Sequence, residues 1–498
     1  MTARVLALAA AVLALAATSA SAHEDTPEKD PGRARPSAPS PHLDGPRSID
    51  LLARARVAGD RSGNVVVHGT HAYLGSYGTH SGGCEGSGVR VFDLRRPRRP
   101  LRVATFAAAG SAAALAGTYT DQVRVAHVRT RRFRGTLAAV GFQRCRPPSD
   151  GFQGFGLYDV TRPARPRRLA LFDVAPAPGA HELWLHARGD RAYAFLTLPR
   201  SELVTSEGSV PGRPDLRIVD VSDPRRPREV GAWGIWSDLG VRPRVDSDPN
   251  APNDFAHSVI TNRAGTRAFV SYWDFGTVIL DVTRPSRPRF LGRTEPPGGD
   301  ANAHSAALAG GERVLVETQE HGSFFGIRAG GYPHLYDVSR PRRPVFLSRY
   351  APPGTETTTV HDPKARGTQA FLSWYEQGVA VVDVSQPASP RPVAHFVPPD
   401  AEGAFVWGVA LGRDYFVASD VGTGLWVLDV RCSVPALSGR TLAQARALAR
   451  AADCSLDRVR GRHARDVPRG RVLSQSTAPG STPPYPSRID VVVSLGPR

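Results

Sequence analysis

The chain has 498 residues and a formal net charge of +17, with 63 lysines and arginines against 46 aspartates and glutamates. One ordinary hydrophobic core does not organise a chain of this length, so the sequence predicts a repeat array or several domains. The basic composition favours an anionic partner. The export predicted below argues against nucleic acid and points to an anionic cell-wall polymer or to lipid head groups. The alternative is that the arginines reflect the GC-rich genome of a bacterium and only solvate the surface.

The N-terminal segment has the pattern of a secretion signal. Arg4 precedes an apolar run from Val5 to Ala17, and a small-residue cleavage site ends at Ala22. The run is too short to remain in a bilayer, and no other segment is apolar for long enough to cross one. We therefore expect residues 1–22 to be a signal peptide and the mature protein to be secreted and not transmembrane. Residues 23–47 are rich in proline and charge, which predicts a disordered linker.

A repeated word organises the chain after this linker. Its clearest copy is VAVVDVSQPASP at 379–390, in which β-prone apolar residues lead into Asp383 and a proline-rich turn follows. Seven copies occur, with their aspartates 46 to 66 residues apart, at Asp93, Asp159, Asp220, Asp281, Asp337, Asp383 and Asp429. Each repeat fits four short strands, A to D, with the word as strand C. Repeats of about 40–50 residues built from short strands are typical of β-propeller blades. We expect the aspartates to stabilise the turn that follows each strand.

The two ends of the array predict how the propeller closes. The seventh repeat has strands A to C but reaches Cys432 without a fourth strand, whereas Ile49 to Val57 is a strand-like segment with no strands before it. Pairing the two would complete one blade and remove an exposed edge. The predicted fold class is therefore mainly β: a seven-bladed propeller over 48–431, closed by the N-terminal strand, followed by a small α+β domain over 432–498.

The last segment and the cysteines add further predictions. The stretch SGRTLAQARALARAADC predicts a helix, in which Thr441 and Gln444 can form a capping box, and three strand-like runs follow it. Four cysteines in an exported protein predict two disulfides. The natural pairs are Cys84 with Cys145, in long loops of neighbouring blades, and Cys432 with Cys454.

Two resemblances follow from these words. The repeated DVSxPxxP-like pattern resembles the LVIVD-repeat family of β-propellers, over about 48–431. The last 67 residues resemble a PASTA domain in the words CSVPALSGRTLAQARALARAADC, VPRGRVLSQSTAPGS and IDVVVSLGP, with Thr477 where that family usually has proline. The PASTA resemblance implies association with peptidoglycan or related glycans. Cys432 and Cys454 look like a disulfide variant of that domain. The LVIVD resemblance implies a fold but no particular ligand.

Loop lengths predict which face of the propeller carries the functional site. Long connections lie between strands B and C (77–87, 143–153, 199–214 and 319–331) and between strands D and A (234–255). In an up-and-down blade both kinds of connection lie on the same side of the disc. Function tends to reside in variable loops on a rigid scaffold, so we place the working surface on this long-loop face.

Histidines recur at one register of strand A, where the long-loop face meets the central channel. Four consecutive repeats carry them, at His181, His257, His304 and His361. Imidazoles gathered at one axis could bind a divalent metal. Glu182 could add a carboxylate, as could Asp121, Glu317 or Glu320. The alternative is structural: each histidine could donate to the backbone of the neighbouring blade and hold the ring together.

Three functions are compatible with this sequence. The first is a wall-associated binding or scaffold protein, monomeric, with peptidoglycan, an anionic wall polymer or a protein as partner. The second is an extracytoplasmic metal-dependent hydrolase or oxidase that uses the histidine cluster. The third is a purely structural, partner-binding propeller in which the histidines join the blades. No GxSxG, HExxH, P-loop or dinucleotide motif occurs in a fitting context, which favours a protein that is not an enzyme.

Overall fold

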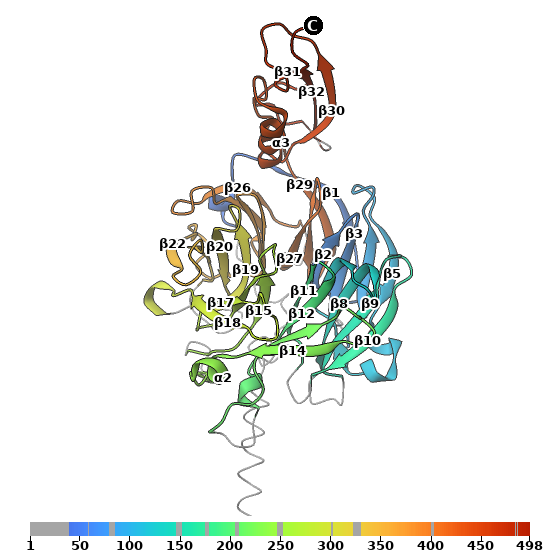
Figure 1. Ribbon diagram of the computed structural model, residues 1–498, viewed down its shortest axis with the longest axis vertical. Coiled ribbons are helices and arrows are strands. Elements are labelled where there is room, and N and C mark those ends of the chain that lie inside the picture. The colour runs from blue at the N-terminus through green and yellow to red at the C-terminus, as the bar shows by residue number, and fades with distance from the viewer. Residues whose placement is uncertain are drawn as a thin grey trace, which may run out of the picture.

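The computed structural model describes residues 39–57, 59–78, 85–145, 152–174, 179–204, 209–246, 252–299, 302–321, 330–399, 403–483, 485 and 487–498. These residues form seven antiparallel sheets arranged as the blades of a propeller, with a small α+β domain at one end (Figure 1). The signal peptide expected over 1–22 lies outside the described residues. No helix in the described part of the chain is both long enough and apolar enough to cross a membrane.

Each blade has its strands in the order A to D from the axis outward. Blade 1 consists of β2 (Arg61–His68), β3 (His71–Gly78), β4 (Val89–Asp93) and β5 (Leu101–Phe106). Blade 2 consists of β7 (Val123–Arg129), β8 (Arg134–Arg144), β9 (Gly154–Asp159) and β10 (Arg167–Asp173). Blade 3 consists of β11 (Glu182–Arg188), β12 (Arg191–Thr197), β13 (Leu216–Asp220) and β14 (Arg228–Trp233). Blade 4 consists of β15 (Ser258–Thr261), β16 (Arg267–Ser271), β17 (Thr277–Asp281) and β18 (Arg289–Arg293). Blade 5 consists of β19 (Ala303–Ala309), β20 (Val314–Gln319), β21 (Pro333–Asp337) and β22 (Val345–Arg349). Blade 6 consists of β23 (Pro363–Arg366), β24 (Gln369–Trp374), β25 (Gly378–Asp383) and β26 (Arg391–Phe396). Strand β6 (Thr118–Tyr119) pairs with the end of β8, and the connections contain α2 (Ile235–Leu239) and the 3₁₀ turns η1 (Pro41–Leu43), η2 (Ala109–Ser111), η3 (Ala113–Leu115), η4 (Ser201–Leu203) and η5 (Pro297–Gly299).

The seventh blade joins the two ends of the array. It contains β27 (Val406–Leu411), β28 (Phe416–Asp420) and β29 (Gly424–Val430), and β1 (Ile49–Ala55) pairs antiparallel with β29 as its outermost strand. The A strands contact one another in the order β2, β7, β11, β15, β19, β23 and β27, and β27 contacts β2. The N-terminal strand therefore occupies the place left empty by the seventh repeat, as the sequence predicts.

The repeated word forms strand C because both faces of that strand are covered by neighbouring blades. All residues of β25 before Asp383 are buried, so the strand is an almost continuous apolar run. A strand with one exposed face would instead alternate apolar and polar residues. In six repeats the aspartate accepts the backbone N–H two residues later at 2.8–3.0 Å. Hydrogen bonds from the Thr283 side chain and backbone N–H, and from the Arg289 guanidinium, lower the pKa of Asp281 to about 2. The aspartates thus have the turn-stabilising role expected of them.

The segment before the propeller differs from its expectation. Residues 39–47, the described part of the expected linker at 23–47, pack against the ring. Leu43 is fully buried in the core cluster of blades 5 and 6, and the Ser40 N–H donates to Gln377 Oε1 at 2.7 Å. Arg47 forms an ion pair with Asp453 at 2.9 Å. A single buried leucine is too little to alter the composition of a segment otherwise rich in proline and charge, so sequence reasoning missed it.

The C-terminal domain contains α3 (Leu442–Ala451), β30 (Ser455–Arg462), β31 (Val472–Gln475) and β32 (Arg488–Ser494), with sheet order β30-β32-β31. The predicted capping box is present, because the Gln444 N–H donates to Thr441 Oγ1 and the Thr441 N–H donates to Gln444 Oε1. The Cys432–Cys454 disulfide, whose Cα atoms lie 4.9 Å apart, is part of the domain core. Cys145 is also disulfide-bonded, and its expected partner Cys84 lies outside the described residues.

Candidate functional site

The four histidines meet where the A strands begin. The ring centroids are 4.4 Å apart for His181 and His257, 3.9 Å for His257 and His304, and 4.3 Å for His304 and His361. The ring of Trp407 in blade 7 continues this row, 4.3 Å from His361. The structure therefore brings together all four histidines, one from each of blades 3 to 6, at the register that the sequence indicates.

Three of these histidines bind the backbone of the next blade. The Nδ1 of His257 lies 3.0 Å from the carbonyl oxygen of His304, that of His304 lies 3.1 Å from His361 O, and that of His361 lies 2.5 Å from Trp407 O. A carbonyl oxygen can only accept, so Nδ1 carries the proton in each case. We call these contacts the interblade clasps. These contacts are the ones expected if the histidines have the structural role considered in the sequence analysis, in which each donates to the backbone of the neighbouring blade.

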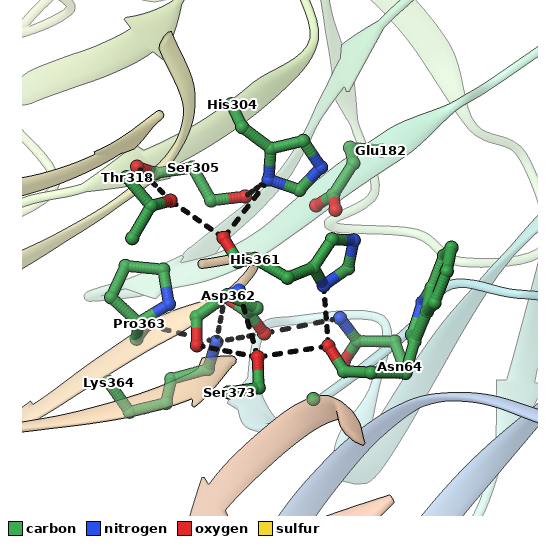
Figure 2. A network of polar contacts seen from close by, with 12 residues as sticks. Asn64, Glu182, His304, Ser305, Thr318, His361, Asp362, Pro363, Lys364 and Ser373 are labelled. Carbon is green, nitrogen blue, oxygen red and sulfur yellow. Dashed lines mark hydrogen bonds and ion pairs between the residues drawn. The ribbon is translucent and has the colours of Figure 1, made fainter. Parts of the chain in front are cut away.

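Hydroxyl groups of strand B add a second donor to the clasps. Thr318 Oγ1 donates to His361 O at 2.6 Å, and Ser373 Oγ donates to Trp407 O at 3.0 Å. Figure 2 shows His304 and Thr318 converging on the same carbonyl oxygen of His361. The pairing of β19 skips His304 and that of β27 skips Trp407. A residue extruded in this way leaves its blade's own ladder, so its polar groups are available to neighbouring blades.

The clasps determine what the other ring nitrogen offers. With the proton on Nδ1, the neutral imidazole presents a lone pair at Nε2. Ligand atoms of His257, His304 and Glu320 all lie within 4.8 Å of one another, and the three residues are 1–2 % exposed. His304 Nε2 lies 3.4 Å from Glu320 Oε2. These three residues are the group among the described residues that could hold a metal ion, and we call them the axial triad.

Two neighbours complete the surroundings of the axial triad. His181 Nε2 lies 2.8 Å from His257 Nε2, and His181 Nδ1 lies 3.1 Å from Gln143 Oε1. The Tyr375 hydroxyl, at the end of strand B in blade 6, donates to Glu320 Oε1 in a short hydrogen bond. His361 belongs to the clasps and to the ring stack, but not to the triad.

The carboxylate beside the histidines is Glu320, not Glu182. Glu182 accepts from Arg124 at 3.1 Å and from Gln122 at 3.0 Å, both in blade 2. His181, the residue before it, faces His257 in blade 4. Successive side chains of a strand point to opposite faces, so the residue next to a histidine in sequence turns away from that histidine's partner. Glu317 is likewise engaged elsewhere, because it accepts from Thr277, Thr294 and Gln319.

Glu182 belongs to a charged layer across the channel. Lys364 Nζ contacts both Asp362 oxygens at 2.5 Å, and Asn64 Nδ2 donates to Asp362 Oδ2 at 3.3 Å (Figure 2). The backbone N–H of Asn64 also donates to Asp121 Oδ1 at 2.9 Å. Burial, with Asp362 and Asp121 nearby, raises the pKa of Glu182 to about 8. Glu182, Asp362 and Lys364 also border a cavity of ≈ 370 Å³, whose walls are otherwise largely apolar residues of the A strands.

A second hollow lies between the propeller and the C-terminal domain, and sequence reasoning did not identify it. Its volume is ≈ 620 Å³, and its lining combines propeller and domain side chains, including Arg366, Arg413, Arg446, Arg450 and Asp429. Burial and two neighbouring aspartates, Asp453 and Asp50, raise the pKa of Asp429 to about 7. Asp429 closes the one repeat that lacks a proline-rich turn, so it differs from its six counterparts.

Comparisons with known proteins agree with the repeats and the last domain. The LVIVD repeat model matches residues 212–233 and 366–396, and the PASTA domain model matches residues 433–495. No curated protein matches the chain. Among solved structures, the computationally designed Ika8 protein is similar with a TM-score of 0.44 and 7% sequence identity, over 76% of this chain and 99% of that chain.

Proposed function

We propose that this chain, which carries LVIVD repeats and a C-terminal PASTA domain, binds the bacterial cell wall through that domain and holds the propeller there as a scaffold. The match to the PASTA domain over 433–495 carries the proposal, because proteins of that kind associate with peptidoglycan. The Cys432–Cys454 disulfide fits an oxidising compartment outside the cytoplasm.

The charge of the C-terminal domain supports an anionic ligand. Residues 432–498 contain eleven arginines and four aspartates, with no lysine or glutamate. Strand β30 is an edge of the domain's sheet and exposes Arg458, Arg460 and Arg462. Arg460 and Arg462 share one face of the strand, about 7 Å apart along it. This spacing suits the repeated phosphates or carboxylates of a wall polymer, which guanidinium groups bind well.

The junction between domain and propeller supports a scaffold role. Asp453, which is 4% exposed as a side chain, pairs with Arg47 at 2.9 Å and with Arg366 at 3.4 Å. Ser455 Oγ donates to Asp414 at 2.9 Å. Arg366 and Asp414 lie at the turns between strands A and B. The C-terminal domain thus sits on the face opposite the long-loop face. The long-loop face carries α2 and lies at the other end of the molecule in Figure 1. Wall binding would leave the long-loop face open to a ligand or partner.

Sedimentation of the mature, tag-free protein with purified peptidoglycan tests the proposal. Reversing the charge at Arg458, Arg460 and Arg462 to glutamate should reduce retention at least about tenfold, and added salt should weaken wild-type binding because the charges are exposed. The matched control reverses three exposed propeller arginines, Arg340, Arg342 and Arg343, and should retain binding. Absence of wild-type retention, or equal losses in both triple variants, would overturn the proposal.

A further inference from the structure

We propose that the axial triad, His257, His304 and Glu320, binds one divalent first-row transition-metal ion of the Zn²⁺ type, and that this ion joins blades 4 and 5 at the propeller axis. The inference is independent of wall binding and goes beyond it. Two imidazoles and one carboxylate are the ligand set that Zn²⁺ and its neighbours prefer, whereas Ca²⁺ and Mg²⁺ prefer oxygen alone.

The spacing of the donor atoms fits such an ion. All three donors lie within 4.8 Å of one another, and the His304 Nε2 to Glu320 Oε2 distance is 3.4 Å. Donor atoms about 2.0–2.2 Å from a tetrahedral ion lie roughly 3.3–3.6 Å from each other. Small side-chain rotations would therefore bring all three donors into bonding range.

The outer shell of the triad is already in place. Metal-binding histidines usually donate their other ring N–H to a carbonyl or carboxylate, which fixes the tautomer and aims the lone pair. His257 and His304 do so through the clasps, at 3.0 and 3.1 Å. Ligating carboxylates are in turn hydrogen-bonded, and Glu320 accepts from the Tyr375 hydroxyl. Structural clasps alone would not require a carboxylate at this position.

Backbone strain also concentrates around the triad. Positive φ is uncommon for residues with a side chain, and strained residues persist where surrounding structure enforces them, often at functional sites. Trp273 (φ 45°) and Tyr375 (φ 27°) are bulky residues in this region at the ends of strand B in blades 4 and 6. Asn302 (φ 37°) exchanges hydrogen bonds with the backbone of Glu320, donating to its carbonyl and accepting from its N–H, each at 3.1 Å.

The position of the triad argues for a stabilising rather than a catalytic ion. The three ligands are 1–2 % exposed, and they come from two adjacent blades. An ion there would add a link between two sheets that are already joined by the His257 clasp, by the Ala303 N–H bond to Trp273 O and by the Glu317 carboxylate. His181, with its Nε2 at 2.8 Å from His257 Nε2, is placed to supply a fourth nitrogen from blade 3.

Metal analysis of the full-length, tag-free protein tests the inference. After incubation with Zn²⁺ and dialysis, we expect about one bound Zn²⁺ per chain, and at free Zn²⁺ about 100 times the Kd the Tm should rise by about 3 °C. Glu320→Gln preserves the bond to Tyr375, and His304→Asn retains a donor for the clasp. Both variants should lose the bound Zn²⁺ and the Zn²⁺-dependent rise in Tm.

The control variant is His361→Asn, which alters a clasp outside the triad. It should lower the Tm without zinc but keep the stoichiometric Zn²⁺ and the same rise in Tm. The proposal is overturned if the wild type retains well under one Zn²⁺ per chain, or if Glu320→Gln binds Zn²⁺ as tightly as the wild type. A variant that does not fold is replaced by a Zn²⁺ titration of wild-type protein, in which absence of any Tm shift counts equally against it.

Discussion

The clasp between blades 6 and 7 allows a quantitative prediction, because one carbonyl oxygen has two donors. Trp407 O accepts from His361 Nδ1 at 2.5 Å and from Ser373 Oγ at 3.0 Å. Either donor alone can satisfy the buried carbonyl. His361→Phe keeps a ring in the stack and should cost about 1 kcal/mol of unfolding free energy. Ser373→Ala should cost about 1–2 kcal/mol, because Ser373 Oγ also accepts from the Asp362 N–H.

The double variant leaves the Trp407 carbonyl buried without either donor. An orphaned buried acceptor costs about 1–3 kcal/mol, so the double variant should lose at least about 1 kcal/mol more than the sum of the two single variants. Urea unfolding monitored by tryptophan fluorescence, with EDTA present, measures all four proteins. His361→Phe combined with Thr130→Val, whose hydroxyl donates to Ser222 O, is the control pair and should be additive. Additivity within about 0.5 kcal/mol in the clasp pair would refute the two-donor reasoning.

Three further predictions follow from other parts of the molecule. The pKa of Asp429 is raised from an unfolded value of about 4 to about 7 in the folded state. Its contribution to stability is therefore complete below about pH 4 and is lost as pH rises from about 4 through 7. Asp429→Asn should flatten the fall in unfolding free energy between about pH 4 and 7, and an unchanged pH profile would contradict this. The Cys432–Cys454 bridge joins residues 22 apart in sequence and so restricts the unfolded chain. Replacing both cysteines by alanine should lower the unfolding free energy of the C-terminal domain by about 3 kcal/mol in denaturant titrations. A loss below about 1 kcal/mol would contradict this prediction. Leu43 is fully buried, so Leu43→Ala should lower the free energy of unfolding, measured in urea, by about 2–4 kcal/mol. The control Val345→Ala, at an exposed position, should change it by less than about 0.5 kcal/mol. Similar values for the two variants would support the linker interpretation of residues 39–47.

The blades were predictable because their chemistry is repeated along the chain. Strand C is covered on both faces, so its word is largely apolar up to the aspartate, and in six of the seven repeats the aspartate accepts the backbone N–H two residues later. The register of His257, His304 and His361 follows from the same repetition. A single copy would carry little information, but consecutive copies place the same side chain at the same radius of the ring.

The carboxylate of the site was not predictable with the same certainty. Glu182 adjoins His181 in sequence, whereas Glu320, which lies beside the histidines, follows a different strand of blade 5 from His304. The choice between them depends on which way each side chain turns, and on the pairing irregularity at His304. Irregularities of this kind arise from packing around the axis and leave little trace in composition. The hollow beside Asp429 depends on how two domains meet, which neither domain's sequence states.

Arg47 shows how closure of the ring and attachment of the C-terminal domain depend on each other. Its guanidinium donates to the carbonyls of Arg431 and Ala452 and pairs with Asp453, while its backbone N–H donates to Val393 O in blade 6. Strand β1 begins two residues later and completes blade 7. Force applied to a wall-bound PASTA domain would enter the propeller through β29, whose outer partner is β1. Arg47 would therefore reinforce the closing strand where such a load enters, together with the Arg431–Asp50 ion pair at 2.7 Å and the packing of Leu52 in the core shared by blades 7 and 1.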